Sequence, residues 1–352
     1  MLLPRTTRTK PWRRLAAALS AAALGVGLLA GCGSDSSDSS DKASDGTSSA
    51  ESGAFPVTVE HAFGTTKVTE APKRVVSVGY TDDQTVLAFG IKPVGMVDQY
   101  PNPAGRTPDV NTQWPWVKEK WGDTRPEVIM KNGDSGPNYE KIAALRPDLI
   151  IAVYSEIDQA AYDKLSRIAP TVGRTKGEKE PFSAPWQDNA LHIAKALGRA
   201  EEGEKMVADI QGKLDAAKKG HPELAGQTAV VLSWYKDSVA PFTSTDVRGR
   251  LVTGLGFSYQ TEIDKVADGN FYTTLSPERV DLVDVDRIFV VNDRADQEAL
   301  KKFKLFANLD AVKNGKVSYL LDSEGPAVGA AISQGTLLSM PYAIDELVKS
   351  VE

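Results

Sequence analysis

Two short segments, far apart in the chain, repeat one pattern. Residues 140–153 read EKIAALRPDLIIAV and residues 278–291 read ERVDLVDVDRIFVV, so a leading Glu, a basic residue, Asp148 with Asp286 and a closing apolar run coincide without a gap. Each copy predicts a helix start followed by a strand that is apolar on both faces, which is typical of a parallel sheet covered by helices. Helix–strand units of this kind are common in α/β proteins, and chance explains part of such a match. The pair nevertheless favours two related α/β lobes, each a mainly parallel sheet flanked by helices.

A long helical pattern separates the two copies. Within residues 183–219, apolar residues recur at helical spacing and mark one buried stripe. We expect two helical pieces, with Ser183 capping the first, Pro185 in its first turn and Gly198 dividing it from the second. Fully helical, the segment spans roughly 50 Å at 1.5 Å per residue, longer than one small lobe needs. The pattern predicts a rigid connection that permits only a small closure of the lobes on binding. It does not decide which of the two helical pieces crosses between the lobes.

Residues 1–31 are predicted to be an export signal. Basic residues precede an apolar run, residues 15–30, which at about 16 residues is shorter than a membrane span. The run ends in Leu-Ala-Gly-Cys, which resembles the bacterial lipobox and implies cleavage before Cys32 and a diacylglyceryl group on its sulfur. Cys32 is the one cysteine of the sequence, so disulfides and cysteine-based metal sites are excluded. An ordinary signal peptide with an incidental cysteine is the alternative, and the Arg13 and Arg14 pair leaves Sec and twin-arginine export open.

The rest of the chain divides into a tether and a folded part. Residues 32–54 are rich in Ser, Asp and Gly and lack the apolar side chains that order a segment, so they predict a flexible tether. Beyond it we expect an N-terminal α/β lobe at residues 55–183, a connecting helical segment at 184–219 and a C-terminal α/β lobe at 220–352. Losing residues 1–31 takes the formal charge from −6 to −11, because five basic and no acidic residues are removed. No basic stripe or recognition motif points to nucleic acid.

The expected elements alternate between strand and helix. In the first lobe they are a hairpin at 57–68, strands at 74–78 and 91–97, a long loop at 98–136, the first copy of the repeat, and a helix with a short strand at 154–172. Loops of that length in compact domains are usually functional. In the second lobe they are strands at 228–232 and 316–321, the second copy of the repeat, a helix end at 251–257, and helices at 300–312 and 333–348.

The strings PKRVVSVG, EKIAALRPDLIIA, LSPERVDLVDVDRIFV and LDAVKNGKVSYL resemble the substrate-binding lipoproteins of ABC importers for iron-siderophores and cobalamin. The resemblance covers residues 57–349 in the family's order. It implies a class III periplasmic-binding-protein-like fold, in which a long rigid helix joins two lobes and a ligand lies in the cleft between them. It also implies an extracytoplasmic, lipid-anchored monomer without a cofactor that delivers an iron-siderophore complex to a membrane permease.

Elementary topology places the ligand at the carboxyl ends of the parallel strands. Aromatic residues are frequent there, and Tyr80, Tyr154 and Trp234 directly follow predicted strands. Trp114 and Trp116 lie in the long loop. Planar rings suit the bulky chelating groups of a siderophore, although each aromatic residue also has a plain packing role open to it, and the two loop tryptophans could only anchor their loop. The predicted strand ends are residues 79–81, 98–100, 154–155, 233–235, 292–294 and 322–324.

An arginine is the expected partner for an anionic ligand. The segment DVRGRLVTGLGF resembles the family's pattern in which an Arg ahead of a helix ending in LGF faces the cleft, which makes Arg248 the first candidate. Arg250 is an alternative, and local pairing of Arg248 with Asp246 is the competing interpretation. Arg106 and Arg294 are weaker candidates. Aromatic residues in loops, together with an arginine, slightly favour an anionic complex as the ligand.

Glu140 and Glu278 open the two copies of the repeat. In the family that the chain resembles, one Glu at this position on each lobe engages arginines of the permease, which implies the same role here. The competing explanation is that an acid at a helix start is favoured by the helix dipole.

Two other protein classes compete with this interpretation. A protein that binds bare metal ions needs converging His and carboxylate ligands, but His61, His192 and His221 lie in a hairpin, a helix and a linker without ligand spacing. An exported enzyme is disfavoured because the common catalytic motifs are absent from the sequence. Within the binding class, haem and cobalamin are the alternative ligands, and the scarcity of His counts modestly against haem.

Overall fold

The computed structural model describes residues 50–100, 110–178 and 180–351. They fall within one compact unit, Gly46–Glu352. The predicted signal peptide, Cys32 and Arg106 lie outside the described residues. Across the part of the chain that is described, no helix has the length and apolar character needed to cross a membrane.

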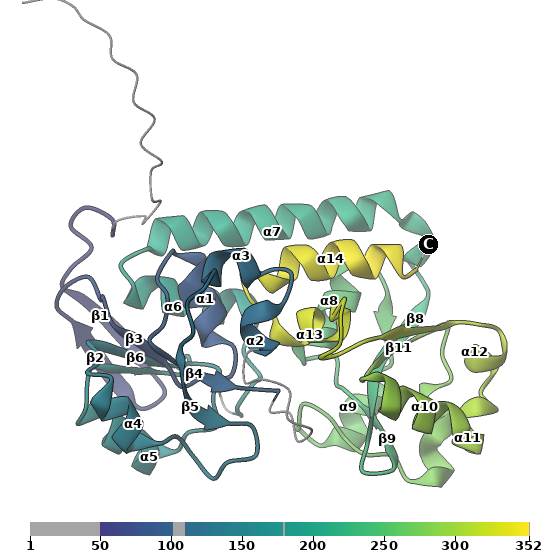
Figure 1. The fold of residues 1–352 in the computed structure, drawn as a ribbon. Coiled ribbons are helices and arrows are strands. Elements are labelled where there is room, and N and C mark those ends of the chain that lie inside the picture. The colour runs from purple at the N-terminus through teal and green to yellow at the C-terminus, as the bar shows by residue number, and fades with distance from the viewer. Residues whose placement is uncertain (1–49, 101–109, 179, 352) are drawn as a thin grey trace, which may run out of the picture. The chain divides into compact units, whose positions relative to one another are not determined.

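The first lobe contains a parallel sheet with the strand order β5-β4-β3-β6-β7 (Figure 1). Its strands bury both faces, as the near-continuous apolar runs predict. Val75 packs toward the cluster that holds Phe89, while Val76 packs toward Ile142 and Leu165 on the other face. The elements are β3 (Val75–Ser77), α1 (Asp82–Ala88), β4 (Gly95–Asp98), α2 (Val110–Gln113), α3 (Lys118–Trp121), β5 (Glu127–Lys131), α4 (Tyr139–Ala144), β6 (Leu149–Ala152), α5 (Gln159–Ser166) and β7 (Thr171–Gly173), preceded by the antiparallel hairpin β1 (Val57–His61) and β2 (Gly64–Val68).

The second lobe contains a mainly parallel sheet with the order β10-β8-β11-β12, and one strand, β9, pairs antiparallel with β8. The elements are η1 (Pro222–Leu224), β8 (Thr228–Tyr235), β9 (Ser238–Pro241), α8 (Val247–Gly254), β10 (Ser258–Tyr259), α9 (Glu262–Ala267), η2 (Pro277–Val283), β11 (Arg287–Val291), α10 (Arg294–Lys302), α11 (Lys304–Ala307), α12 (Asp310–Lys313), β12 (Val317–Leu320), α13 (Val328–Gln334) and α14 (Ser339–Lys349).

The repeat has the same structural role in both lobes. Strand β6 pairs in parallel with β3, and strand β11 pairs in parallel with β8. Along the chain, β3 and β8 are the strands with which their sheets begin. Asp148 accepts hydrogen bonds from the backbone N–H groups of Lys73 and Arg74 at 2.8 and 2.9 Å, just before β3. Asp286 accepts one from the N–H of Thr228 at 2.7 Å, at the start of β8. Each aspartate therefore satisfies donors where the neighbouring strand begins, which explains why the two copies share it.

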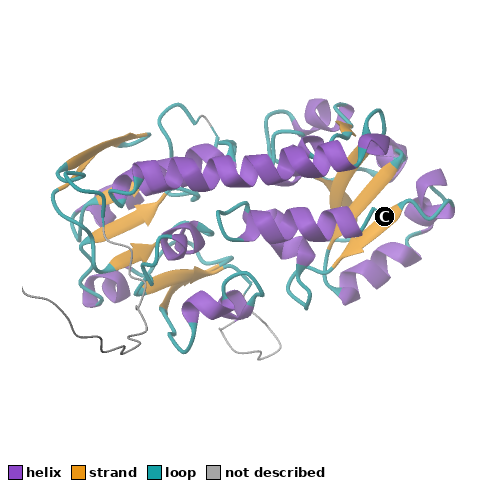
Figure 2. Cartoon of the chain, turned by 90° about the horizontal axis from the view of Figure 1, so that it is seen from above, coloured by secondary structure: helices purple, strands orange, loops and turns teal. Residues whose placement is uncertain are grey.

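Two helices follow one another in the central segment, α6 (Trp186–Ala196) and α7 (Ala200–Gly220), and the break falls at Gly198 as predicted. Near its start α7 packs on the first lobe, where Gly203 lies against Ala194 and Phe89. Near its end α7 packs on the second lobe through Leu214, which lies under Gly254. Figures 1 and 2 show α7 running alongside both lobes, so α7 is the piece that crosses between them.

The predicted cap of the first helical piece is wrong. Pro185 occupies the position before α6 and offers no side-chain hydrogen bond, while the Ser183 hydroxyl donates to the carbonyl of Glu180 at 2.7 Å. Ser183 lies outside the helix because the backbone before a proline is biased toward extended geometry, which moves the helix start to Trp186.

Several predicted boundaries also differ from the structure. The expected strand at 91–97 begins only at Gly95, because Pro93 cannot donate to a sheet. The expected loop at 98–136 contains α2, α3 and the whole of β5. In the second copy of the repeat the helix is of the 3₁₀ type.

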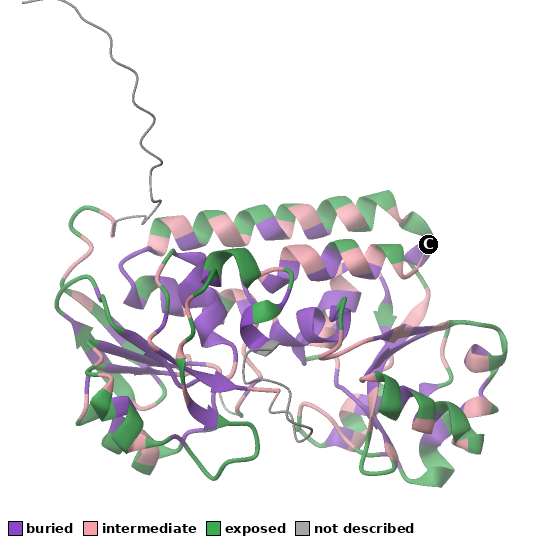
Figure 3. Ribbon diagram, in the orientation of Figure 1, coloured by how far each residue is buried: buried purple, intermediate pink, exposed green. Residues whose placement is uncertain are grey.

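Two predicted helices are interrupted. The helix expected at 300–312 is divided among α10, α11 and α12, because Phe303 and Leu309 have extended backbone. The last helix is split into α13 and α14, because Gly335 adopts the left-handed conformation that ends a helix. Both α1 and α13 are buried along their whole length, whereas the outer face of α7 is exposed (Figure 3).

Candidate binding cleft

Three adjoining cavities lie where the carboxyl ends of the first-lobe strands face the second lobe. Their volumes are about 190, 170 and 340 Å³. Glu156 lines all three cavities, and Tyr80 lines two of them. Two of the cavities have walls from both lobes, and both of these are lined by Phe182 and Phe271. We call these three cavities the cleft. Its central cavity is lined by Tyr80, Gln99, Asn132, Tyr154, Glu156, Phe182, Arg248, Phe271 and Ser333.

Buried backbone contacts position the two predicted tyrosines. Asp82, at the start of α1, accepts hydrogen bonds from the N–H groups of Val153 at 2.7 Å and Tyr154 at 3.0 Å. The N–H of Tyr80 donates to the carbonyl of Tyr154 at 2.9 Å. Gly79 permits this arrangement, because a Cβ there would come within 2.0 Å of the Asp82 carboxylate. The loops after β3 and β6 are thus fixed to one another, and both tyrosines line the same cavity.

Phe182 joins the aromatic residues of the two lobes. Its ring centroid lies 4.7 Å from that of Tyr154, 5.9 Å from Tyr80 and 5.6 Å from Phe271, the last in an edge-to-face arrangement. The backbone of Phe182 has φ of 69°, an uncommon conformation for a residue with a side chain. Such an outlier in the lining of a cleft is a feature of functional sites.

Arg248 is held in the cleft by a dense set of contacts. Its Nη1 lies 3.0 Å from both carboxylate oxygens of Asp246, whose side chain is 0 % exposed, and its Nε donates to Ser333 at 2.9 Å. The guanidinium carbon lies 3.9 Å from the centre of the Phe242 ring. Asp246 also caps α8 by accepting from the N–H of Arg248 at 2.9 Å. Arg248 therefore lines the central cavity and pairs with Asp246, and its contact with a ligand stays a prediction.

Behind the cleft, a polar network joins the lobes. In α1, Gln84 donates to Gln334 of α13 at 2.8 Å, and its carbonyl oxygen accepts from Thr336 and Trp116 at 2.9 Å each. Gln334 donates in turn to Gln99 at 2.6 Å. Nearby, the Tyr100 hydroxyl donates to Asp322 at 3.2 Å. Burial raises the pKa of Asp322 to about 6, although the charge of Arg248 acts to lower it.

The remaining aromatic candidates pack away from the central cavity. Trp114 is 3 % exposed and stacks on Trp116 with ring centroids 5.1 Å apart. Trp116 contacts Tyr342 of α14 and donates to Gln84, a geometry that favours the anchoring role. Trp234 packs on Phe303 with centroids 5.2 Å apart. Ligand contact by these three residues stays a prediction.

The other arginines have partners of their own. Arg294 is exposed and donates to Glu324 at 3.0 Å. Arg250 donates to the carbonyls of Thr245 and Ser183. Neither appears among the residues that line the central cavity, whereas Arg248 does.

Glu140 and Glu278 lie at equivalent places in the two lobes. Glu140 is in the first turn of α4 and Glu278 in the first turn of η2, and both are exposed. A hydrogen bond to its own backbone N–H, followed by one from Ser276, lowers the pKa of Glu278. Both acids are therefore available to a partner molecule, and permease docking stays a prediction.

The three histidines each contact another group of the described protein. His61 contacts Thr66 at 2.9 Å, His192 contacts the carbonyl of Gly173 at 3.0 Å, and His221 contacts Glu223. Among the described residues, no group of three or more His, Cys, Asp or Glu is placed to hold a metal ion.

Sequence reasoning missed several cleft residues. Phe182 and Phe271 are aromatic residues in segments rich in Pro, Gly and polar residues, outside any predicted element. An aromatic residue in such a segment was the one feature of the sequence that could have indicated a place in the cleft. Glu156 lies one residue beyond the predicted strand end at 154–155. Gln99 belongs to a predicted strand end, but an amide there gives no distinctive pattern.

A buried pair of carboxyl groups beside the cleft predicts an unusual pH dependence of stability. Burial, followed by the charge of Asp82, raises the pKa of Asp83 to about 8, and burial raises that of Asp82 to about 6. A carboxyl group whose pKa is raised on folding binds its proton more tightly in the folded state, so its contribution to stability is lost as the pH rises through the folded-state pKa. Between pH 6.5 and 8.5 we expect the free energy of unfolding to fall by about 1–2 kcal/mol.

Urea unfolding at pH 6.5, 7.5 and 8.5 checks this expectation. Asp83→Asn should flatten the profile, because it removes the titrating group. Asp209→Asn, at an exposed position of α7, should leave the profile unchanged. An equal pH slope in the wild type and in Asp83→Asn would show that Asp83 does not titrate in this range.

Comparisons with known proteins identify the family. A model of the family described as periplasmic binding protein matches residues 75–324. The chain belongs to the periplasmic binding protein family. Among its relatives in this family, the probable siderophore-binding lipoprotein YfiY of Bacillus subtilis is 28% identical over 333 residues, which cover 90% of this chain and 93% of YfiY. The Fe(3+)-citrate-binding protein YfmC of the same organism is 28% identical over 306 residues, covering 86% of this chain and 88% of YfmC.

A solved structure of a periplasmic binding protein agrees with this fold. PiaA of Streptococcus pneumoniae in complex with ferrichrome superposes with a TM-score of 0.69 and is 27% identical, covering 84% of this chain and 97% of PiaA. The fold class predicted from the sequence is confirmed: two α/β lobes with mainly parallel sheets, joined by the long helix α7, as in class III periplasmic binding proteins.

Proposed function

We propose that this periplasmic binding protein captures a ferric siderophore in the cleft between its lobes and delivers it to the permease of an ABC importer. It acts outside the cytoplasm as a monomer that is tethered to the membrane through a lipid on Cys32. In this proposal the folded part of the chain is divided into an N-terminal lobe at 55–183, a connecting segment at 184–219 and a C-terminal lobe at 220–352.

The observation that carries this proposal is the composition of the cleft. Tyr80, Tyr154, Phe182 and Phe271 place aromatic rings from both lobes around one cavity, and Arg248 lies at its wall. Flat rings pack against the planar chelating groups of a siderophore, and the amide and hydroxyl groups of Gln99, Asn132 and Ser333 supply hydrogen bonds. The names of YfiY and YfmC and the ferrichrome bound to PiaA support an iron chelate as the ligand class.

The test is quenching of intrinsic fluorescence on titration with ferric siderophores, haem and cobalamin. We expect saturable quenching by at least one ferric siderophore, with Kd about 1 μM or lower, since cleft ligands of this size bury most of their surface. Saturable binding of haem or cobalamin alone would support the alternative ligands within the same family. Binding of none of these compounds would contradict the proposal.

Docking to the permease is the second part of the proposal. Reversing the charge of both exposed acids, Glu140→Lys with Glu278→Lys, should lower uptake of radioactive iron chelate by about tenfold or more, because opposed charges steer and hold a docking partner. The Kd for the ligand should stay within about twofold, since neither acid lines the cleft.

A matched control reverses two other exposed acids, Glu119 of α3 and Glu204 of α7. This control should retain uptake, which separates a docking role from a general effect of net charge. Unchanged uptake in the Glu140 and Glu278 double variant would remove the docking role.

A further inference from the structure

The positive charge of Arg248 is already neutralised within the protein. The side chain of Asp246 is fully buried, and both of its carboxylate oxygens accept hydrogen bonds from Nη1 of Arg248. The hydroxyl of Ser333 accepts a hydrogen bond from the Nε–H. A buried ion pair of this geometry acts toward the cleft as a dipole, with little net charge. Among the described residues, Nη2 makes no hydrogen bond, so Arg248 still offers a donor there to an oxygen atom of a ligand.

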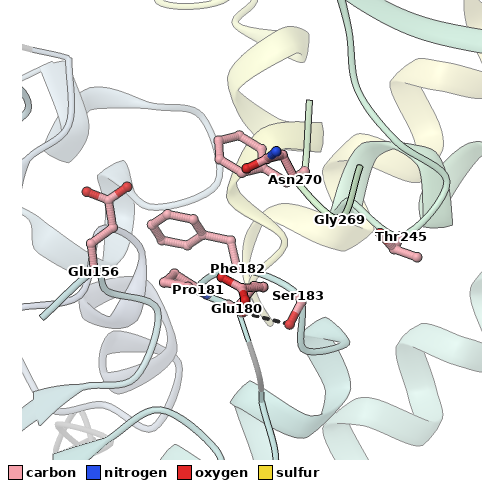
Figure 4. Close-up of a pocket in the computed structure, with 9 residues that line it drawn as sticks. Glu156, Glu180, Pro181, Phe182, Ser183, Thr245, Gly269 and Asn270 are labelled. Atoms are coloured by element: carbon pink, nitrogen blue, oxygen red, sulfur yellow. Dashed lines mark hydrogen bonds between the residues drawn. The ribbon is translucent and has the colours of Figure 1, made fainter. Parts of the chain in front are cut away.

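Among the described residues, Glu156 has no such partner. It is exposed on the loop after β6, and it makes no hydrogen bond or ion pair with another described residue. Figure 4 shows Glu156 on one side of a cavity and Thr245 and Gly269 on the other, with Phe182 between them. Since Glu156 lines all three cavities of the cleft, a ligand anywhere in the cleft lies near this residue.

The other charged residues of the cleft do not reverse this balance. Glu180 adds a further carboxylate to one cavity. The third cavity holds Asp134, Asp158 and Lys164, so acids outnumber bases there as well. The ammonium of Lys164 lies 5.1 Å from the centre of the Tyr139 ring. Among the described residues, the walls of the cleft therefore carry a net negative charge.

Ferric chelates differ in charge in a way that such a cleft distinguishes. Three hydroxamates, each with one negative charge, balance Fe³⁺ and give a neutral complex, and a cationic side arm makes it positive. Three catecholates, each with two negative charges, leave a trianion. Among the described residues of the central cavity, a trianion would meet the carboxylate of Glu156 and no cation other than the paired Arg248. A neutral complex suffers no such repulsion and still uses the aromatic rings and the donor of Arg248.

From this charge pattern, we propose that the cleft selects neutral or cationic ferric hydroxamates over anionic ferric catecholates, and that Glu156 is a residue that sets this selectivity. The proposal rests on the proposed function, because it presumes that the ligand is a ferric chelate. It reverses the slight lean toward an anionic complex that an arginine in the sequence suggests.

The test compares Kd values of the full chain for three probes: ferrichrome as the neutral tris-hydroxamate, ferrioxamine B as a cationic one, and ferric enterobactin as the tris-catecholate. We expect the two hydroxamates to bind at least about tenfold more tightly than the tris-catecholate at low ionic strength, and the ratio to shrink as salt is added. Glu156→Gln should reduce the ratio about fivefold, mainly by tightening the anionic complex.

Asp246→Asn provides a second, independent variant. The Asn side chain keeps the cap of α8 but leaves the charge of Arg248 unbalanced, so the anionic probe should again gain affinity. Glu204→Gln, on the exposed face of α7, is the matched control and should leave every Kd unchanged.

The outcomes separate this inference from the proposed function. Tight binding of ferric enterobactin in preference to the hydroxamates, or a ratio that Glu156→Gln leaves unchanged, overturns the inference while the proposed function holds. Failure of every ferric chelate to bind overturns both.

Discussion

Replacing Gln84 with leucine should lower the free energy of unfolding by about 3–5 kcal/mol, because each buried polar partner left without a hydrogen bond costs about 1–3 kcal/mol. Gln84 is 1 % exposed and satisfies Gln334 and Thr336 of the second lobe as well as Trp116 of the first. Leucine has a similar size, so the loss reflects the missing hydrogen bonds more than a cavity. Urea unfolding followed by tryptophan fluorescence measures the effect.

The matched control is Gln159→Leu. Gln159 is exposed on α5 and donates only to Asp163, so this change should cost at most about 0.5 kcal/mol. Equal stabilities of the two variants would show that the network around Gln84 does not hold the lobes together.

The same contacts bear on how far the lobes move. The helix α7 packs on both lobes, and the Gln84 network joins α1 to α13. Opening the cleft widely would break these hydrogen bonds, so ligand binding should be accompanied by only a small closure. Small-angle scattering of the free and liganded protein checks this, and Gln84→Leu should show a larger change than the wild type.

The sequence predicted the parts of the fold that depend on local pattern. The repeat predicted a buried strand in each lobe, and the structure has β6 and β11 there, each in a mainly parallel sheet. That Asp148 and Asp286 satisfy backbone donors at the start of β3 and β8 was not predicted. Gly198 predicted the break between α6 and α7, because glycine accepts the left-handed backbone found there.

The cleft was harder to predict, because its residues are brought together only by tertiary packing. Tyr80, Tyr154 and Arg248 followed from strand ends and from the family resemblance. Phe182 and Phe271 are single aromatic residues in loops, and Gln84 is one amide in a short helix, so no periodicity marks them. The strand β5 was missed because it lies between segments rich in Pro and Gly that resemble a continuous loop.

Replacing Arg248 with leucine should weaken both the fold and the binding of the ligand. Removing one member of a buried ion pair leaves Asp246 charged and unpaired, which should lower the free energy of unfolding by about 3–5 kcal/mol. Loss of the donor that faces the cavity should raise the Kd for the ligand by about tenfold or more. A single variant does not distinguish a binding role from a structural one, because a destabilised cleft also binds poorly.

The double variant Arg248→Leu with Asp246→Asn separates the two roles. It removes the unpaired charge while keeping a side chain that caps α8, so most of the lost stability should return in urea unfolding. The Kd should stay high, because the donor facing the cavity is still missing. If affinity instead returns together with stability, Arg248 acts only by holding Asp246, and the hydrogen bonds to the ligand must come from neutral groups such as Gln99, Asn132 and Ser333, which line the same cavity.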